Sequence, residues 1–363
     1  MLSRKLRITG RRSWWRSSTR AALAVVCACA AAPAAAQVAA GGDIARHVGL
    51  GGGGVALQGV EVSPIINPAA LATPVGFRLR FSRLGYGGTG EINQEAWRLL
   101  IRTKDLERLK DLGLDLARYR TRMWTENGVG VRFSTWHLDL AGAGQLAGDP
   151  NAALQRWVRQ GAAFFPPPNA RLVASQGYYL SPSVGYGHRW RLRGDLPGSL
   201  DAGARVKLWI GRYRQVRFRG VPDGSGFDIV DRETADVKDQ GWGADLGFRF
   251  VPDGEPNLSF GLSVLGLVEP SIGEMRQERT FNLGTAYRLS PRLTLVADLL
   301  NVTGANERRV KVATGAEYTV VPGWITLRGA VTSRGLAGGI GLGPIQVAFT
   351  RDGETTLGTQ IRF

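Results

Sequence analysis

The chain has 363 residues, 44% of them hydrophobic, with 50 glycines, 2 cysteines and a slightly negative mean hydropathy of −0.10. No apolar run of about 18 residues follows the first 36, which excludes a helical membrane protein. The formal net charge is +16, and removing the seven basic residues of the first 20 leaves about +9 (16 − 7). We expect no nucleic-acid partner, because the basic residues are spread through alternating segments of a chain that looks exported.

The N-terminus predicts an export signal spanning residues 1–36. Residues 1–20 are basic and contain no acid, residues 21–32 are apolar, and small residues follow up to Ala36. This order is typical of a cleaved secretory signal. Cleavage after Ala36 leaves a mature chain without cysteine, since Cys27 and Cys29 both lie in the apolar stretch. Lipidation at Cys29 is the alternative.

A glycine-rich block at residues 49–57 and an Asn-Pro-Ala motif beginning at Asn67 come next. A phosphate-binding loop is an alternative interpretation, but no Gly-Lys-Ser/Thr follows and no acidic residue is suitably placed. The block and motif resemble the opening of the FadL-like outer-membrane barrels. That superfamily includes fatty-acid and aromatic-hydrocarbon channels, PorV-type secretion shuttles and TraF-like barrels.

The resemblance implies that residues 37–74 form a glycine-rich segment that folds back into a barrel. In the superfamily this segment is a hatch that plugs the periplasmic lumen. Carried over, the hatch residues are Gly51, Gly52, Gly53, Gly54, Asn67 and Pro68. Residues 75–363 then form the transmembrane β-barrel, with the first strand beginning at Val75.

A helical insertion is predicted at about residues 90–120, where apolar residues recur near helical spacing. After an upward first strand, it lies outside the cell and either lines a ligand groove or packs on the barrel rim for stability. The groove residues we predict are Trp97, Leu100 and Ile101. A second short helix is expected between residues 151 and 163.

Alternating segments separated by turn residues predict a meander of antiparallel strands over the rest of the chain. Those we place are 183–192, 202–218, 241–251, 258–268, 280–289, 293–301, 309–320, 325–332, 336–342, 345–351 and 355–363. Two or three more fit between residues 118 and 180. The fold class is therefore all-β: an antiparallel transmembrane β-barrel of about 14 strands, the FadL-like number.

Loop lengths and strand faces also favour a barrel. Turns at one end are short, whereas loops at the other, such as 219–240 and 269–278, are longer, as in outer-membrane barrels. In residues 293–299, leucines and Ala297 alternate with residues such as Asp298, which suits lipid outside and water inside. Two aromatic belts are expected, unless these are scattered sheet aromatics: Trp190, Tyr287, Tyr318 and Trp324 near the periplasm, Trp242 and Tyr213 near the outside.

The last eight residues alternate and end on an aromatic residue. Such a strand resembles the closing strand of an outer-membrane barrel, which barrel-assembly machinery recognises and which pairs with the first strand. The residues of this assembly signal are Gly358, Ile361 and Phe363. An ordinary amphipathic C-terminal strand is the alternative.

Basic residues gather near the outer strand ends, and their guanidinium groups pair well with phosphates. We therefore expect contact with lipopolysaccharide, or else a solvated charged rim. The contact residues are Arg212, Arg214, Arg217 and Arg309.

Enzyme chemistry is not expected. The three histidines, His47, His137 and His188, are isolated and do not have metal-ligand spacing, and no Gly-x-Ser-x-Gly elbow occurs. A hydrolase built on His137 or His188 with a serine is conceivable, but nothing singles one out. We predict no catalytic residue, no metal and no cofactor.

The sequence thus predicts an outer-membrane β-barrel channel for passive uptake of small hydrophobic compounds, such as fatty acids or hydrocarbons. Its expected partners are outer-membrane lipid, lipopolysaccharide, the barrel-assembly machinery and a hydrophobic small-molecule ligand. The alternative is a non-transporting barrel that acts as a scaffold or shuttle for surface or secreted proteins, like the PorV-type relatives. An apolar tunnel favours transport, and a solid plug favours the scaffold.

Overall fold

The computed structural model divides after Pro33, and its described residues belong to the unit Ala34–Phe363. The described ranges are 44–58, 63–80, 83–89, 121–160, 169, 171–223, 226–304, 310–333, 335–343, 345–350, 355–359 and 361–362. The predicted export signal and the predicted helical insertion at 90–120 lie outside these residues.

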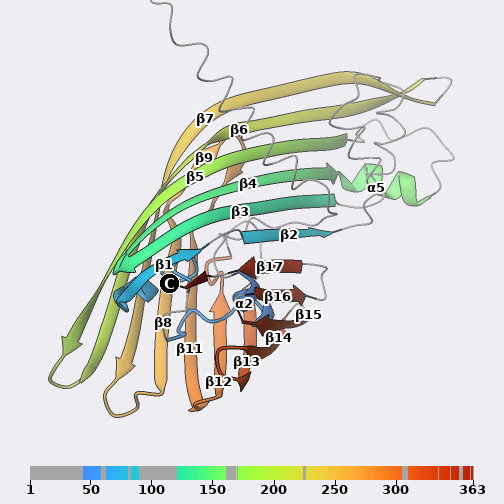
Figure 1. Cartoon of the computed structure of the whole chain (residues 1–363). Helices are drawn as coiled ribbons and strands as arrows, with labels where there is room; N and C mark the ends of the chain where they lie inside the picture. The colour runs from blue at the N-terminus through green and yellow to red at the C-terminus, as the bar shows by residue number, and fades with distance from the viewer. Residues whose placement is uncertain are drawn as a thin grey trace, which may run out of the picture. The chain divides into compact units, whose positions relative to one another are not determined.

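Antiparallel strands make up most of the described chain (Figure 1). The main sheet contains β1 Val75–Arg80, β2 Arg83–Thr89, β3 Thr121–Ser134, β4 Trp136–Pro150, β5 Arg171–Leu192, β6 Gly198–Asp223, β7 Gly226–Pro252, β8 Leu258–Val268, β11 Thr280–Ser290, β12 Leu293–Leu300, β13 Lys311–Val321, β14 Ile325–Thr332, β15 Gly335–Leu342, β16 Ile345–Thr350, β17 Thr355–Thr359 and β18 Ile361–Arg362. A separate hairpin joins β8 to β11 and consists of β9 Ser271–Ile272 and β10 Met275–Arg276.

The strand pairings run in a ring. β3 pairs with β4 on one side and with both β1 and β2 on the other. β1 and β2 in turn pair with β18 and β17, the two parts of the C-terminal strand. Counting β1 with β2 and β17 with β18 as single strands, the sheet's 16 described strands fill fourteen positions (16 − 2). The predicted antiparallel all-β fold of about 14 strands is confirmed.

The C-terminal strand pairs as its sequence pattern predicts. Gly358 lies opposite Gln346 of β16 and Arg83 of β2, and Ile361 lies opposite Leu79 of β1. These pairings cover the edge that the last strand would otherwise expose. Phe363 lies outside the described residues.

Three neighbouring strands are much longer than a membrane requires. β5, β6 and β7 have 22, 26 and 27 residues, whereas about 9–11 cross a bilayer. The loop predicted at 219–240 is therefore wrong, because β6 and β7 continue pairing to Asp223 and Gly226. More than half of the residues in this stretch are charged or polar, which suits a strand that extends beyond lipid. The prediction required an apolar face, which only the part within lipid needs.

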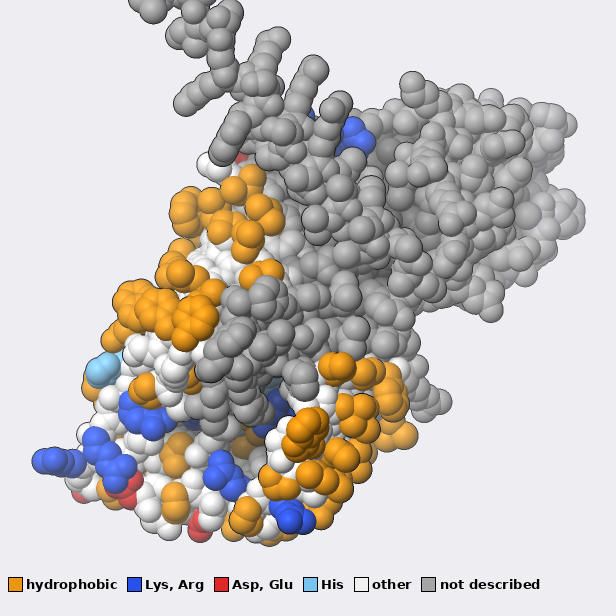
Figure 2. All heavy atoms as spheres, in the orientation of Figure 1, with side chains coloured by type: hydrophobic (Ala, Val, Ile, Leu, Met, Phe, Trp, Pro, Cys, Tyr) orange, Lys and Arg blue, Asp and Glu red, His pale blue; other side chains and the backbone are white. Residues whose placement is uncertain are grey.

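The two faces of the strands differ as predicted. In β12, Leu295 and Leu299 are exposed, whereas Val296 and Asp298 are buried on the inner side. Hydrophobic side chains gather in broad patches on the described surface (Figure 2). An apolar outer face around a polar inner face is typical of a barrel surrounded by lipid.

The aromatic belts are mostly as expected. Exposed aromatic side chains near the short turns are Trp190, Tyr287, Tyr318 and Trp324, and Trp242 is exposed toward the long-loop end. The prediction for Tyr213 is wrong, because its side chain is only 4% exposed and lies on the inner face of β6. Polar residues occur on both faces of this strand beyond the belt, so alternation there does not reveal which side faces out.

Helices are few among the described residues, and none of them is long and apolar enough to cross a membrane. α5 Ala152–Arg159 falls within the short helix predicted at 151–163. α2 Ile44–Gly49 and the 3-10 helix η1 Pro68–Ala72 belong to the N-terminal part, which packs against the inner face of the sheet.

Candidate functional site in the barrel lumen

The lumen holds the described N-terminal residues 44–58 and 63–74, here called the lumen segment. Its first part is α2, which ends where Gly51, Gly52 and Gly54 take positive φ angles of 70°, 86° and 100°. Glycine adopts this left-handed region without steric cost, so the chain reverses direction within four residues. His47 Nδ1 donates a hydrogen bond of 2.6 Å to the carbonyl of Gly53 and holds the turn closed.

The second part of the lumen segment is η1, which begins at the Asn-Pro-Ala motif. Asn67 caps the helix, because its Oδ1 accepts a hydrogen bond of 3.0 Å from the amide of Ala69. Pro68 occupies the first helical position, where no amide hydrogen is needed. Asn67 Nδ2 donates to the carbonyl of Val55 at 2.7 Å and to that of Phe248 in β7 at 3.1 Å. One asparagine thus joins η1, the glycine turn and the wall.

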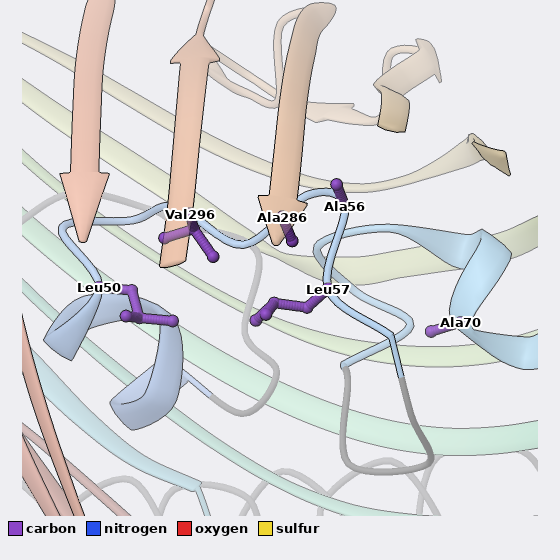
Figure 3. Close-up of a cluster of buried hydrophobic side chains, with 6 residues drawn as sticks. All are labelled: Leu50, Ala56, Leu57, Ala70, Ala286 and Val296. Carbon is purple, nitrogen blue, oxygen red and sulfur yellow. The ribbon is translucent and has the colours of Figure 1, made fainter. Parts of the chain in front are cut away.

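An apolar cluster packs the lumen segment onto the wall (Figure 3). Its members from the segment are Leu50, Ala56, Leu57 and Ala70, and its members from the wall are Ala286 of β11 and Val296 of β12. All six are at most 3% exposed. The cluster therefore joins the lumen segment to β11 and β12 through buried apolar contacts.

Asp298 of β12 binds the glycine turn. Its two carboxylate oxygens accept hydrogen bonds from the amides of Gly54 at 2.7 Å and Val55 at 3.0 Å. The side chain is 2% exposed. A methyl group on Gly53 would lie 2.6 Å from Asp298 Oδ2, so glycine is needed there for the carboxylate to reach the turn. Next to it, the hydroxyl of Ser259 in β8 donates to the carbonyl of Ala56 at 2.8 Å.

Arginines of the wall bind the carbonyls of the segment. Arg249 of β7 donates to the Leu57 carbonyl at 2.7 Å and forms a buried ion pair with Asp201 of β6. Arg132 of β3 donates to the carbonyls of Ala70 at 2.5 Å and Thr73 at 2.7 Å. Hydrogen bonds from charged donors are stronger than neutral ones, so these contacts hold the segment firmly.

An ion pair joins α2 to the wall at β13. Arg46 donates to both carboxylate oxygens of Glu317 in β13 at 2.6 and 2.9 Å. Glu317 also accepts a hydrogen bond of 2.6 Å from Arg328 in β14. All three side chains are at most 12% exposed. The segment is therefore tied to the wall on several sides of the ring.

The structure brings the predicted hatch residues together. Gly51 to Gly54 and Asn67 with Pro68 all lie in the lumen and are joined through Val55. Movement of this segment as a hatch remains a prediction.

A charged layer follows toward the long-loop end. Along the inner face of β6, Gly203 contacts η1, and Arg205 and Lys207 come next. Both bind the buried carboxylate of Asp245 in β7, at 2.7 Å and 2.6 Å. The amide of Gly266 donates to the same carboxylate at 2.8 Å. The layer is buried.

An aromatic cluster lies beyond the charged layer, and the sequence did not single it out. Tyr179 of β5 and Trp209 of β6 stack with their ring centroids 4.0 Å apart. Ile272 and Met275 of the β9–β10 hairpin cover them, together with Tyr213 and Ala143. The cluster lies about 20 Å from Gly203, six residues along β6 at about 3.4 Å each. It is a second buried apolar cluster on the inner wall, separated from the lumen segment by the charged layer.

Glu274 of the hairpin ties it to the wall. Its carboxylate accepts hydrogen bonds from Gln215 Nε2 at 2.5 Å and from the Tyr213 hydroxyl at 3.3 Å. Burial and the carboxylate of Glu274 raise the pKa of Tyr213. The phenol therefore stays protonated at neutral pH, as the hydrogen bond requires.

Several predicted residues lie elsewhere. Trp97, Leu100, Ile101 and Arg309 fall outside the described residues, and only the backbone of Arg217 is described. Arg212 and Arg214 of β6 both contact Asp236 of β7. Within the described ranges, no group of three or more His, Cys, Asp or Glu is arranged to hold a metal ion.

Comparison with known proteins gives similarities among solved structures only. No family model matches the chain, and no curated protein does. The Ralstonia pickettii toluene transporter TbuX is 12% identical at a TM-score of 0.45, covering 82% of this chain and 92% of its own. A mutant of the monoaromatic hydrocarbon channel TodX is 11% identical (TM-score 0.44; 81% and 91% covered). A Pseudomonas aeruginosa FadL homologue is 12% identical (0.43; 86% and 94%).

Proposed function

We propose that this protein is an outer-membrane β-barrel channel for the passive uptake of small hydrophobic compounds, such as fatty acids or hydrocarbons. The observation that carries the proposal is the buried aromatic cluster around Tyr179 and Trp209 on the inner wall. Lumen-facing positions of such barrels are polar, so a packed aromatic cluster there is a candidate binding site for an apolar solute, which would take the place of the covering side chains of Ile272 and Met275. Exposed leucines and aromatic residues on the outer face support a position in lipid.

In the proposed mechanism, the lumen segment is a hatch. A solute enters from the long-loop end, binds the aromatic cluster and leaves on the short-turn side when the segment shifts. Besides the apolar cluster, hydrogen bonds and ion pairs bind the segment to the wall, those of Asp298, Arg249 and Glu317. Water can replace such partners, so the segment can leave the wall without any strand unpairing. No energy source is required.

Binding of radiolabelled oleate to the purified barrel tests the proposal. Trp209→Ala removes a stacking surface, so oleate affinity is expected to fall about tenfold, as for loss of one buried aromatic contact. Trp242→Ala is the matched control, because Trp242 is 61% exposed on the outer face and its loss leaves the lumen unchanged. Equal affinities of the two variants, or no binding by the parent, would reject the proposal. Native mass spectrometry of the gently purified barrel then identifies any co-purified apolar molecule.

The second candidate is a non-transporting scaffold or shuttle for surface or secreted proteins. The charged layer of Arg205, Lys207 and Asp245 favours it, since these buried groups lie between the aromatic cluster and the lumen segment. An apolar solute has to pass them, and a desolvated ion pair is a poor path for it. A barrel that binds no oleate but retains a protein partner on purification would support the scaffold.

The remaining roles are proposals of the same kind. We propose that Gly358, Ile361 and Phe363 form the signal read by the barrel-assembly machinery. We also propose that lipopolysaccharide contacts Arg212, Arg214, Arg217 and Arg309. Asp236 already pairs with the first two of these arginines. Loss of co-purified lipopolysaccharide on replacing these arginines by alanine would support the contact.

A further inference from the structure

Three glycines stand side by side on the inner wall under η1. Gly187 of β5 is the register partner of Gly203 of β6, which is in turn the partner of Gly247 of β7. All three are buried. They form a row that crosses three neighbouring strands, and η1 lies along it.

The row leaves no space for a side chain. A methyl group on Gly203 would lie 2.0 Å from the carbonyl oxygen of Pro68, and one on Gly187 would lie 2.3 Å from the amide nitrogen of Ala72. One on Gly247 would lie 1.9 Å from Oδ1 of Asn67. These distances are more than 1 Å below van der Waals contact, and the atoms met are mainly backbone. The wall and η1 therefore touch backbone to backbone.

Space, and not backbone conformation, explains these glycines. None of the three has a positive φ, so any residue can adopt their extended conformation. Glycine weakens a strand, since it has no side chain to pack. Not every strand glycine is so placed, because a methyl group on Gly329 of β14 would meet nothing within 4 Å. The close approach is therefore not a general property of glycine in these strands.

We infer that Gly187, Gly203 and Gly247 form a seat that fixes the closed position of the lumen segment. They are positioning residues: their missing side chains let η1 lie flat enough for the wall to bind it. Arg132 reaches the Ala70 carbonyl at 2.5 Å, and Asn67 reaches the Phe248 carbonyl at 3.1 Å. A shift of η1 by about 1 Å away from the wall weakens the first of these hydrogen bonds and breaks the second. A single methyl group in the seat therefore releases the segment and opens the lumen at this level.

The inference rests on the proposed hatch role, and a buried thiol tests it separately. The parent carries Cys27→Ala, Cys29→Ala and Ser63→Cys, in which a cysteine replaces a serine of similar size that is 0% exposed. Reaction of this thiol with a membrane-impermeant maleimide reports exposure of the segment. Gly203→Ala is expected to raise the labelling rate at least about tenfold, as overpacking a tight contact does. Ion conductance of the barrel in planar bilayers is expected to rise in the same variant.

Gly329→Ala is the matched control and is expected to label and conduct like the parent. Heat-modifiable migration in gels reports whether each barrel is folded. Should Gly203→Ala fail to fold, Gly185→Ala takes its place as a milder variant, since its methyl group would lie 2.7 Å from Cδ1 of the fully buried Leu71 and push on η1 through that side chain. Adding Leu71→Ala removes that atom and is expected to restore slow labelling. A general weakening of the wall would not be corrected in this way.

A folded Gly203→Ala barrel that labels and conducts like the parent would overturn the inference, as would failure of Leu71→Ala to correct Gly185→Ala. The proposed function has a separate outcome. Faster labelling together with absent oleate uptake leaves the seat standing and rejects the channel. Oleate uptake together with unchanged labelling in every seat variant supports the channel and rejects the seat.

Discussion

Replacing Asp298 by alanine is expected to loosen the glycine turn without unfolding the barrel. The substitution removes the acceptor of two buried amides, those of Gly54 and Val55. A hydrogen bond to a charged group contributes about 1.5–3 kcal/mol, so two give about 3–6 kcal/mol. Water entering the lumen offsets part of this loss, which leaves about 3 kcal/mol. That corresponds to about a hundredfold increase in the opening of the segment.

Hydrogen–deuterium exchange of peptides from residues 44–58 measures this opening. In Asp298→Ala the amides of this region are expected to exchange about a hundredfold faster, while peptides from β13 and β14 keep their rates. Asp253→Ala serves as control, because Asp253 lies in a short turn and pairs with an Arg191 side chain that is 67% exposed. Exchange at the parent rate in Asp298→Ala would refute the view that this carboxylate holds the segment.

Three further outcomes are expected. Arg249→Ala leaves the buried Asp201 with one partner fewer, so urea unfolding of the barrel in vesicles should show a loss of about 3 kcal/mol; an unchanged midpoint would contradict this. Hydrogen bonding to Arg212 lowers the pKa of Asp236 from 3.8 to about 2. Between these pH values the carboxylate of Asp236 binds a proton more readily when this part of β7 is unfolded. The paired end of β6 and β7 is therefore expected to lose stability as the pH falls from about 4 to about 2. Cleavage within 226–240 by pepsin should rise over that interval in the parent and stay level in Asp236→Asn. Trp324→Ala removes a belt side chain that is 70% exposed and should cost about 1 kcal/mol in vesicles, with no loss in detergent.

The sequence predicts the strands that cross the membrane because two environments act on alternate residues. In β12 the exposed leucines suit lipid on the outer side, and the buried Asp298 suits the lumen on the inner side. The same rule fails for β6 and β7 beyond the membrane, where polar residues are frequent and no lipid contact requires an apolar outer face. It predicts a loop at 219–240 and an outward-facing Tyr213, and the structure corrects both.

The lumen site is only partly readable from sequence. The glycine block and the Asn-Pro-Ala motif mark the lumen segment, because a tight turn and a capped helix need those residues locally. No local sequence pattern identifies the seat glycines. Each lies in a different strand, and only the strand register brings Gly187, Gly203 and Gly247 together. The aromatic cluster was missed for the same reason. Its rings come from β5 and β6, and the side chains that cover them come from a hairpin distant in the chain.

A disulfide between the lumen segment and the wall determines whether the segment has to move for uptake. A methyl group on Gly49 would lie 3.3 Å from Cβ of Arg328, close to the roughly 3.5–4.5 Å that joins two bonded cysteines. Gly49→Cys with Arg328→Cys, in the parent lacking Cys27 and Cys29, is oxidised in cells whose own fatty-acid channel is deleted. Arg328→Cys alone accounts for the lost arginine. Uptake of radiolabelled oleate is expected in reduced cells, to stop on oxidation and to return with reductant. Equal uptake in the oxidised and reduced states, or none in either, would contradict a hatch that opens for transport.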